Sequence, residues 1–243
     1  MRILCIGNSF SQDAARYLHQ IAASDGAEIE VWNLYIGGCP LERHWSNMEN
    51  RLADYLLEIN GVSKGNYVDA QTMLERNDWD FVTLQQVSQS SVDYGTYQPA
   101  LNRVNDFVRE KAPAAKRLIH QTWAYAPDSP RLTEELGYHA RQEMFRDLER
   151  AYQRAADAIK AAGIIPSGAV FEAMQDQTDA RMYRDGFHAS LGIGRYVLGL
   201  LWYGYLTGRP VRNVSFETLD EPVSAAGLEQ ARQVVSQVLE RLK

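Results

Sequence analysis

The amino-acid sequence predicts an α/β protein: a three-layer sandwich in which helices cover both faces of a five-stranded parallel sheet. Short apolar runs alternate with longer stretches of helical periodicity along the chain. Such alternation is typical of a mostly parallel sheet that is covered on both sides. No repeat, low-complexity segment or linker divides the chain, so a single domain over residues 1–243 is expected. The 45% apolar content is enough for one sizeable core.

Each expected strand is a short apolar run bounded by turn or polar residues. In chain order these runs are Arg2–Ile6, Glu28–Asn33, Phe81–Leu84, Arg117–Gln121 and Ile164–Pro166. Each expected helix repeats its apolar residues three or four positions apart, as in Leu41–Ile59, where Trp45, Met48, Leu52, Tyr55, Leu56 and Ile59 keep that spacing. The expected helices are Ser11–Ser24, Leu41–Ile59, Pro99–Lys111, Gln142–Ala162, Leu191–Leu206 and Ala225–Leu242.

Two stretches have the composition of loops, Gly61–Asn66 and Tyr125–Gly137. The second follows a strand, so it either walls a substrate cleft or is a plain surface excursion.

Composition argues against several classes of partner. The chain has 25 basic and 31 acidic residues, a net charge of −6 and no dense Lys/Arg run, so no nucleic-acid partner is expected. Tyr196–Leu206 is too short to span a bilayer, so no membrane association is expected. The sequence begins with strand-like residues and no signal-like stretch, which favours a cytoplasmic protein; a secreted protein trimmed of its signal peptide would look the same. The oligomeric state is not predicted.

Metal and cofactor motifs are also missing from the sequence. Cys5 and Cys39 lack metal-ligand spacing, and two cysteines exclude a disulfide framework. The chain has no His-Glu-x-x-His, no Cys-x-x-Cys and no phosphate-binding glycine loop. Neither a metal nor a cofactor is therefore expected.

The most informative segment is Gly7-Asn8-Ser9, directly after the first apolar run. It predicts a buried strand, a tight turn and a serine at the mouth of the next helix. That place is the carboxyl edge of the sheet, where parallel sheets bind ligands. Ser9 is therefore a candidate nucleophile; the alternative is that Ser9 or Ser11 only caps the helix. The Gly-x-Ser-x-Gly elbow of α/β-hydrolases is absent.

A candidate acid–base pair lies near the other end, in Asp185-Gly186-Phe187-His188. A three-residue separation across a turn lets both side chains project to one side. The carboxylate can then hold the imidazole in the tautomer that accepts a proton from serine. The alternative is a loop ion pair, with Ser190 capping the next helix.

Candidate oxyanion donors follow the second and third strands. Gly37-Gly38 permits close backbone approach, so the Gly38 N–H is one candidate, and a plain turn before Pro40 is the alternative. Gln85 and Gln86 end the third strand, where an amide can donate to an oxyanion or simply close the strand.

Gln121 and Trp123 end the fourth strand and could bind substrate, the tryptophan by stacking on a sugar ring; its default place is the core. The remaining histidines singled out, His44, His120 and His139, are expected to be structural.

These blocks stand in the order Gly7-Asn8-Ser9, Gly37-Gly38, Gln85-Gln86 and Asp185-x-x-His188. In this order the chain resembles the SGNH, or GDSL-like, hydrolase superfamily, from the first strand to the helix that begins at Leu191. Asp-x-x-His before a helix is the most specific block, and Gly-Asn-Ser is a variant of the family's Gly-Asp-Ser. The resemblance implies a five-stranded parallel sheet in flavodoxin-like order and no metal or cofactor.

The resemblance also implies roles for individual residues. Ser9 would be the nucleophile, His188 the general base and Asp185 the residue that orients it. The backbone N–H groups of Ser9 and Gly38 would donate to the oxyanion. The third block departs from the family's Gly-x-Asn-Asp, because this chain has Gln-Gln-Val-Ser, and it suggests a divergent subgroup. Gln86 is the expected replacement donor. Gln85 is its competitor and is otherwise expected to bind substrate.

The function expected on this basis is a serine esterase that cleaves a carboxylic ester through an acyl-enzyme. A small acyl group on a carbohydrate is the preferred substrate, with lipid-type esters and thioesters left open. The alternative is a non-catalytic module that binds a sugar or nucleotide on the same scaffold, because fold does not determine function.

Overall fold

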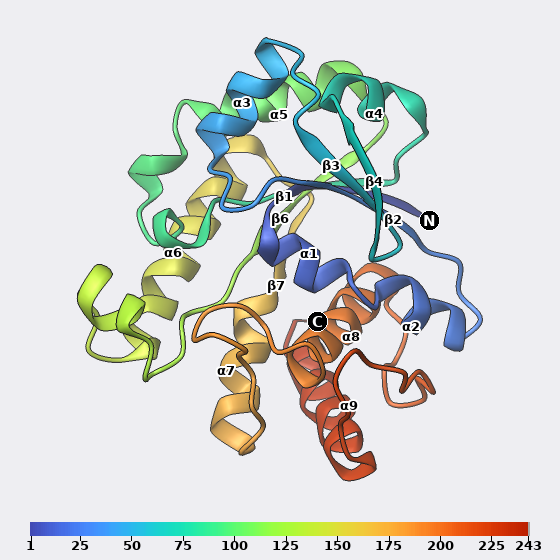
Figure 1. The fold of residues 1–243 in the computed structure, drawn as a ribbon, viewed down its shortest axis with the longest axis vertical. Coiled ribbons are helices and arrows are strands. Elements are labelled where there is room, and N and C mark those ends of the chain that lie inside the picture. Colours follow the sequence, from blue (N-terminus) through green and yellow to red (C-terminus); the bar gives the residue numbers. More distant parts are fainter. Residues whose placement is uncertain (243) are drawn as a thin grey trace.

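The centre of the molecule is a seven-stranded sheet with the strand order β4-β3-β2-β1-β5-β6-β7 (Figure 1). A computed structural model of the chain describes residues 1–242. The strands are β1 (Arg2–Gly7), β2 (Glu30–Tyr35), β3 (Tyr55–Ile59), β4 (Val62–Val68), β5 (Phe81–Leu84), β6 (Lys116–Gln121) and β7 (Gly163–Pro166). Strands β2, β1, β5, β6 and β7 are parallel, and β3 and β4 pair antiparallel beside them. All five expected strands are present, but the expectation of a five-stranded sheet is wrong because a hairpin adds two.

That hairpin lies where the sequence predicts other structure. Helix α3 (Leu41–Glu49) ends well before Ile59, and the rest of the expected helix contains β3. Asn60 and Gly61 form the turn with φ values of 54° and 75°, the geometry that favours Asn-Gly in hairpins. The apolar residues of 52–59 fit both helical and alternating spacing, so periodicity alone misassigned them. The segment 61–66, expected to be a loop, is mostly strand β4.

Helices cover both faces of the sheet (Figure 1). One face carries α3, α4 (Ala70–Arg76), α5 (Ala100–Lys111) and α6 (Arg141–Ile159). The other carries α1 (Ser9–Ala15), α2 (Leu18–Ser24), α7 (Ser167–Gln177), α8 (Ile193–Thr207) and α9 (Ala225–Glu240). The three-layer arrangement is confirmed, whereas the sequence does not predict α4 or α7 and expects one helix in place of α1 and α2. Short 3-10 segments span Ser88–Ser90 and Tyr94–Tyr97, and a π-helical turn spans Arg131–Glu135.

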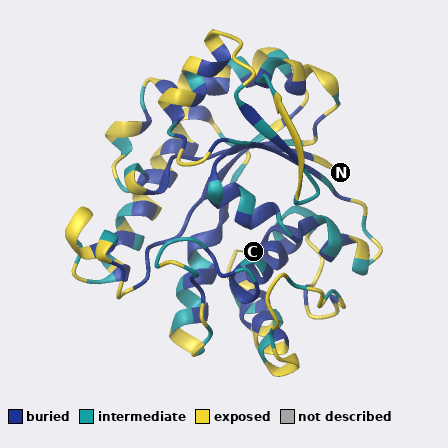
Figure 2. Ribbon diagram, in the orientation of Figure 1, coloured by how far each residue is buried: buried dark blue, intermediate teal, exposed yellow. Residues whose placement is uncertain are grey.

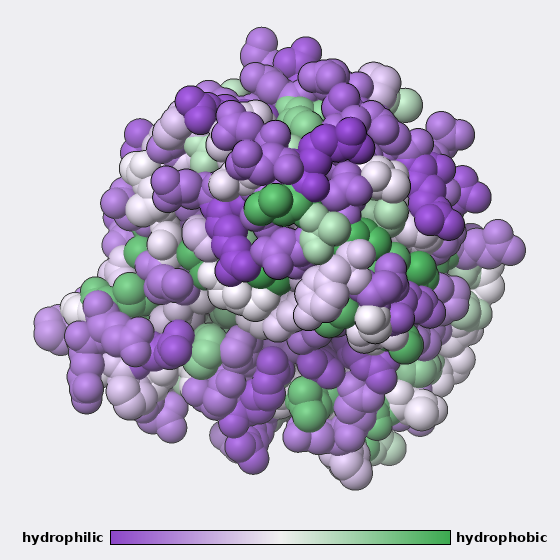
Figure 3. Space-filling model, turned by 45° about the horizontal axis from the view of Figure 1, so that its top comes forward, coloured by the Kyte–Doolittle hydropathy of each residue, from purple (hydrophilic) through white to green (hydrophobic). Residues whose placement is uncertain are grey.

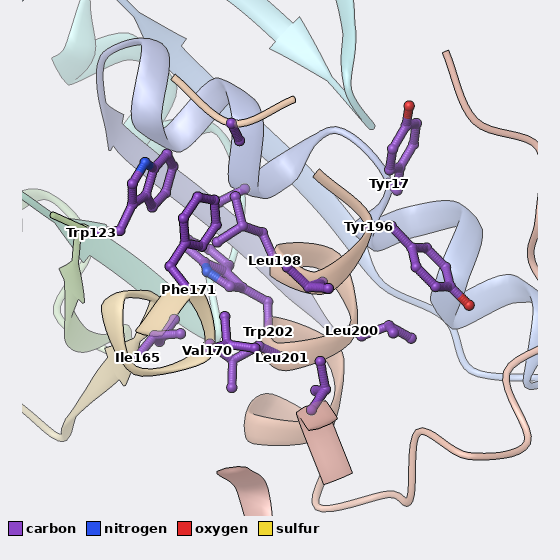
Figure 4. Packing of buried hydrophobic residues seen from close by; sticks show 14 of the residues in the cluster. Tyr17, Trp123, Ile165, Val170, Phe171, Tyr196, Leu198, Leu200, Leu201 and Trp202 are labelled. Carbon is purple, nitrogen blue, oxygen red and sulfur yellow. The ribbon is translucent and has the colours of Figure 1, made fainter. Parts of the chain in front are cut away.

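Each face of the sheet has its own apolar core (Figure 2). Successive residues of β1 face different cores, Ile3 one and Leu4 the other, and neither is exposed. Burial on both faces is typical of strands in the middle of a parallel sheet. In the core between the sheet and α7 and α8, Trp123, Phe171 and Trp202 are large buried side chains (Figure 4).

The face shown in Figure 3 is mostly hydrophilic, with apolar residues in small separate groups. Large exposed apolar side chains include Val62 and Tyr67 on the hairpin and Leu52 just before it. Among the helices formed by residues 1–242, none is both long enough and apolar enough to cross a membrane.

Candidate active site

Ser9 is the first residue of α1 and directly follows the turn at the end of β1. Asn8 caps this helix: its backbone is extended and its side chain accepts a hydrogen bond from the Phe10 N–H. Ser11 is buried, and its hydroxyl lies 2.7 Å from Oδ1 of Asn33. Because Asn8, and neither serine, caps the helix, the Ser9 hydroxyl is left for other contacts.

Gly7 allows the turn to pack closely. A Cβ at this position would lie 2.4 Å from Oγ of Ser11 and 2.9 Å from Oε1 of Gln85, which is too close for either neighbour. Ser9 lies just after the carboxyl end of β1, at the point where the strand order changes direction between β1 and β5. Open α/β sheets bind ligands in the crevice at such a switch point.

The side chains of Ser9, His188 and Asp185 form one continuous row of hydrogen bonds. Nε2 of His188 lies 2.8 Å from Oγ of Ser9, and Nδ1 of His188 lies 2.7 Å from Oδ2 of Asp185. Asp185 also accepts from the His188 backbone N–H at 2.8 Å, which closes the turn around Gly186. Partial burial raises the pKa of the Asp185 carboxyl, but the hydrogen bonds from His188 outweigh burial, and the net pKa lies below the ordinary 3.8.

Asp13 holds the segment that carries this pair against α1. Its fully buried carboxylate accepts from Nη1 of Arg184 at 2.9 Å and from the backbone N–H of Ala189 at 3.1 Å. These two residues flank the 185–188 segment on either side. Nε of Arg195, on α8, donates to the same carboxylate at 2.8 Å. We call residues 185–188 the histidine turn. Asp13, on the helix that begins with Ser9, therefore holds both ends of this turn.

Two backbone N–H groups are expected to donate to an oxyanion, those of Ser9 and Gly38. Within residues 1–242, neither Ser9 nor Gly38 has a hydrogen-bond acceptor for its N–H. Gly38 is exposed and has a φ of 60°, a left-handed conformation that favours glycine. Within the described residues these two groups therefore keep a free hydrogen-bonding valence.

The glutamine pair does not take the place expected for it. Oε1 of Gln86 accepts from the backbone N–H groups of Leu41 and Val87, at 3.0 and 2.8 Å, and its Nε2 donates to the Thr96 carbonyl at 2.9 Å. Gln85 is also buried, and its amide binds Asn8 through Nε2 and His120 through Oε1. The expectation that Gln86 or Gln85 donates to an oxyanion is not supported, because both amides are already committed.

Gln121 and Trp123 are also enclosed, with exposed fractions of 5% and 0%. Trp123 stacks between Phe10 and Phe171, at ring-centroid distances of 4.3 and 4.6 Å. Its indole N–H donates to the Phe187 carbonyl at 2.8 Å, which ties the core to the histidine turn. The expectation that Trp123 lines a substrate cleft is wrong, because its ring belongs to the core. Gln121 is buried at the end of its strand, and its expected contact with substrate stays a prediction.

The loop of residues 125–137 lies beside the site. The guanidinium carbon of Arg131 is 4.1 Å from the ring centroid of Phe187, and that ring is 3.9 Å from the ring of His188. The loop therefore packs against the segment that carries His188, and its role as the wall of a substrate cleft stays a prediction.

Sequence reasoning missed Asn8, Asp13 and Arg184. One signal was available: Asp13 follows Ser9 by four residues, so both lie on the same side of a helix. A carboxylate on the buried side of an amphipathic helix requires a partner, and Arg184 stands next to the Asp-x-x-His block. Within residues 1–242 no group of three or more His, Cys, Asp or Glu is arranged to hold a metal ion.

The sequence matches a family model described as "Domain of unknown function (DUF4886)" over residues 2–236. The chain belongs to the DUF4886 family. The structure of a DUF4886 family protein from Bacteroides uniformis covers 99% of this chain and 95% of its own, with a TM-score of 0.90 and 29% sequence identity. No curated protein matches the sequence.

More distant structures share the fold of this DUF4886 chain. A proposed GDSL-like lipase from Parabacteroides merdae aligns over 85% of this chain and 95% of its own, with a TM-score of 0.56 and 16% identity. An acetyl xylan esterase from Geobacillus stearothermophilus aligns over 90% and 97%, with a TM-score of 0.50 and 14% identity. The expected SGNH-type fold is thus confirmed at the level of architecture.

Proposed function

We propose that the chain is a serine esterase that hydrolyses a carboxylic ester through an acyl-enzyme. The observation that carries the proposal is the continuous row of hydrogen bonds from Asp185 through His188 to Ser9. The N–H groups of Ser9 and Gly38, which have no acceptor among residues 1–242, add donors for a developing oxyanion.

In the proposed reaction, Oγ of Ser9 attacks the acyl carbon while Nε2 of His188 takes the hydroxyl proton. The carbonyl electrons move to the oxygen, which the Ser9 and Gly38 N–H groups hold. The tetrahedral intermediate collapses, the C–O bond to the alcohol breaks, and His188 returns the proton to the leaving oxygen. Water then repeats the cycle on the acyl-enzyme, with His188 again as base, and releases the acid.

A small acyl group on a polar alcohol, such as a carbohydrate, suits the surroundings of Ser9 best. Ser9 is partly exposed and Gly38 is exposed. Two aromatic rings lie beside His188: Phe187 is partly buried and is covered by the Arg131 guanidinium, and Phe10 is buried and stacked on Trp123. Neither ring offers an open channel to a long acyl chain. The fold shared with an acetyl xylan esterase is consistent with this choice.

The proposal predicts Ser9-dependent turnover of a short-chain chromogenic ester such as p-nitrophenyl acetate. Ser9→Ala should abolish turnover above the uncatalysed rate. His188→Ala should lower kcat by about 10²- to 10⁴-fold, since it removes the general base. Ser46→Ala, at an exposed position in α3, is the matched control and should keep wild-type activity.

Labelling with a fluorophosphonate gives an independent measurement, read by mass spectrometry of the peptide that contains Ser9. A folded wild-type chain that neither turns over esters nor labels at Ser9 would favour the non-catalytic binding module. Full activity in Ser9→Ala would refute the assignment of the nucleophile.

A further inference from the structure

A row of side-chain hydrogen bonds crosses the carboxyl ends of three neighbouring strands, beneath the candidate site. Nδ1 of His120, on β6, lies 2.8 Å from Oε1 of Gln85, which follows β5. Nε2 of Gln85 donates to Oδ1 of Asn8, after β1, at 2.8 Å. Nδ2 of Asn8 donates to the carbonyl of Cys39, in the loop after β2, at 3.2 Å. We call the side chains of His120, Gln85 and Asn8 the Gln85 bridge.

The orientation of every group in the bridge is determined by one backbone N–H. Oδ1 of Asn8 accepts from the Phe10 N–H at 3.1 Å, so its Nδ2 has to face Cys39. Gln85 must then turn its Nε2 toward Asn8 and its Oε1 toward His120. The ring of His120 therefore carries its hydrogen on Nδ1. A reversed amide at any point would set two oxygens or two donors against each other.

The bridge is shielded from water, so its hydrogen bonds have no solvent competitor. The exposed fractions of Asn8, Gln85 and His120 are 1%, 2% and 0%. Burial lowers the pKa of His120 to about 3, which keeps the ring neutral at physiological pH. The ring also packs edge-on against Trp202, at a centroid distance of 4.9 Å. A neutral, packed histidine is a fixed donor at the far end of the bridge.

The bridge and Gln86 hold the same loop, residues 36–41. The Ile36 N–H donates to the Gly7 carbonyl at 3.3 Å, on one side of Gly38. On the other side, Asn8 holds the Cys39 carbonyl and Gln86 accepts from the Leu41 N–H at 3.0 Å. Gly38 itself has no side chain and its Cβ position faces open space, so its N–H direction depends on these anchors.

We propose that Gln85 and Gln86 are positioning residues, which fix the loop of residues 36–41 so that the N–H groups of Gly38 and Ser9 converge on one oxyanion. The proposal rests on the proposed esterase function and goes beyond it, because it gives the glutamine pair a role through the backbone and not as a direct donor. Asn8 carries the effect to both sides, since it caps the helix that begins with Ser9 and also binds the loop.

The test compares Gln85→Met with Gln85→Glu. Methionine has a similar length but cannot donate to Asn8, and kcat should fall about ten- to hundredfold with KM changed by less than about threefold. Such a split is expected when an interaction matters only in the transition state. His120→Phe, which keeps the ring but loses the donor, should give a smaller loss of the same kind and serves if Gln85→Met does not fold.

Gln85→Glu adds a pH signature that a structural defect would not produce. A buried carboxyl has a raised pKa, so at mildly acidic pH the protonated glutamic acid can still donate to Asn8. Its ionised form cannot donate, and it faces Oδ1 of Asn8. The ratio of variant to wild-type kcat should therefore fall as the pH rises from about 5.5 to 8.5. For Gln85→Met the same ratio should not change with pH.

Val104→Ala is the control for lost stability, because Val104, on α5, is fully buried in the core on the face of the sheet opposite to α1. It should lower Tm and leave kcat unchanged. Wild-type kcat in folded Gln85→Met and Gln85→Glu would overturn the bridge, and so would an equal loss in Val104→Ala at the same Tm. If the wild-type chain has no Ser9-dependent turnover, the proposed function fails and the bridge with it; an active wild type with unaffected Gln85 variants defeats the bridge alone.

Discussion

The role of the Asp185 carboxylate can be tested by the substitution Asp185→Asn. Asparagine keeps the size of the side chain but not the charge, and its amide can hold the His188 ring in the wrong tautomer. Because the pKa of the Asp185 carboxyl lies below its ordinary value, the side chain is ionised at neutral pH and its charge is available to an imidazolium. Asp185→Asn should lower kcat by about 10²- to 10⁴-fold.

The measurement is kcat for a chromogenic ester at pH 7 to 9, with Asp179→Asn as control. Asp179 is an exposed acid in the preceding loop and its substitution should leave kcat unchanged. A value for Asp185→Asn within tenfold of wild type would mean that the carboxylate only shapes the turn.

At the scale of residues, the sequence was informative where chemistry is encoded in short spacing. Asp185 and His188 are three residues apart, and their contact follows from a local turn. The partners of Gln86 could not be predicted, because an amide binds whatever backbone group the tertiary structure brings within reach, here Leu41 and Thr96. The residue type of a glutamine does not indicate whether its amide is exposed and free to donate to a ligand or buried and hydrogen-bonded to the backbone.

At the scale of elements, α1 and the 184–189 segment are joined by Asp13. Asp13→Asn should weaken this contact, because it leaves the guanidinium groups of Arg184 and Arg195 without their buried counter-charge. Breaking a buried ion pair from one side costs on the order of 3 kcal/mol of unfolding free energy. We expect a loss of this order in urea denaturation, and a lower kcat in the molecules that remain folded, since His188 is held less firmly beside Ser9.

Asp220→Asn is the matched control, because Asp220 pairs with the same Arg195 at 3.0 Å but lies nearer the surface. It should cost much less stability and leave kcat unchanged. Equal effects of the two substitutions would contradict a specific role for Asp13.

The elements were predictable where one pattern fitted the apolar residues. In residues 55–59 two patterns fitted, and the decisive signal was the Asn60-Gly61 dipeptide that follows. The break between α1 and α2 has no such signal in the apolar spacing, which continues from Ala14 to Leu18 and Ile21. The spacing of apolar residues does not predict where a helix ends when tertiary contacts determine that end.

At the scale of the whole molecule, buried histidines make stability depend on pH. Burial lowers the pKa of His44 and of His120 to about 3, from an ordinary 6.5. Between these values the unfolded chain binds protons that the native protein does not. The contribution of these two histidines to the free energy of unfolding is therefore fully present above pH 6.5. It is lost as the pH falls toward 3, by about 1.4 kcal/mol per pH unit for each histidine.

His44→Phe should reduce this slope, because one of the two groups no longer titrates. The measurement is the free energy of unfolding in urea between pH 4.5 and 7.5. His139→Gln, at an exposed position, should keep the wild-type slope. Identical slopes for wild type and His44→Phe would show that burial of this ring does not control acid stability.

The four-residue interval between Ser9 and Asp13 has a consequence for related sequences. Inserting or deleting one residue there would turn the carboxylate by about 100° around the helix axis, away from Arg184 and Ala189. The interval can accept substitutions, but not a change of length. We therefore expect chains of this architecture to keep the spacing Ser-x-x-x-Asp at the first helix and Arg-Asp-x-x-His near the other end, whereas residue 189, which Asp13 contacts through its backbone N–H, is free to vary.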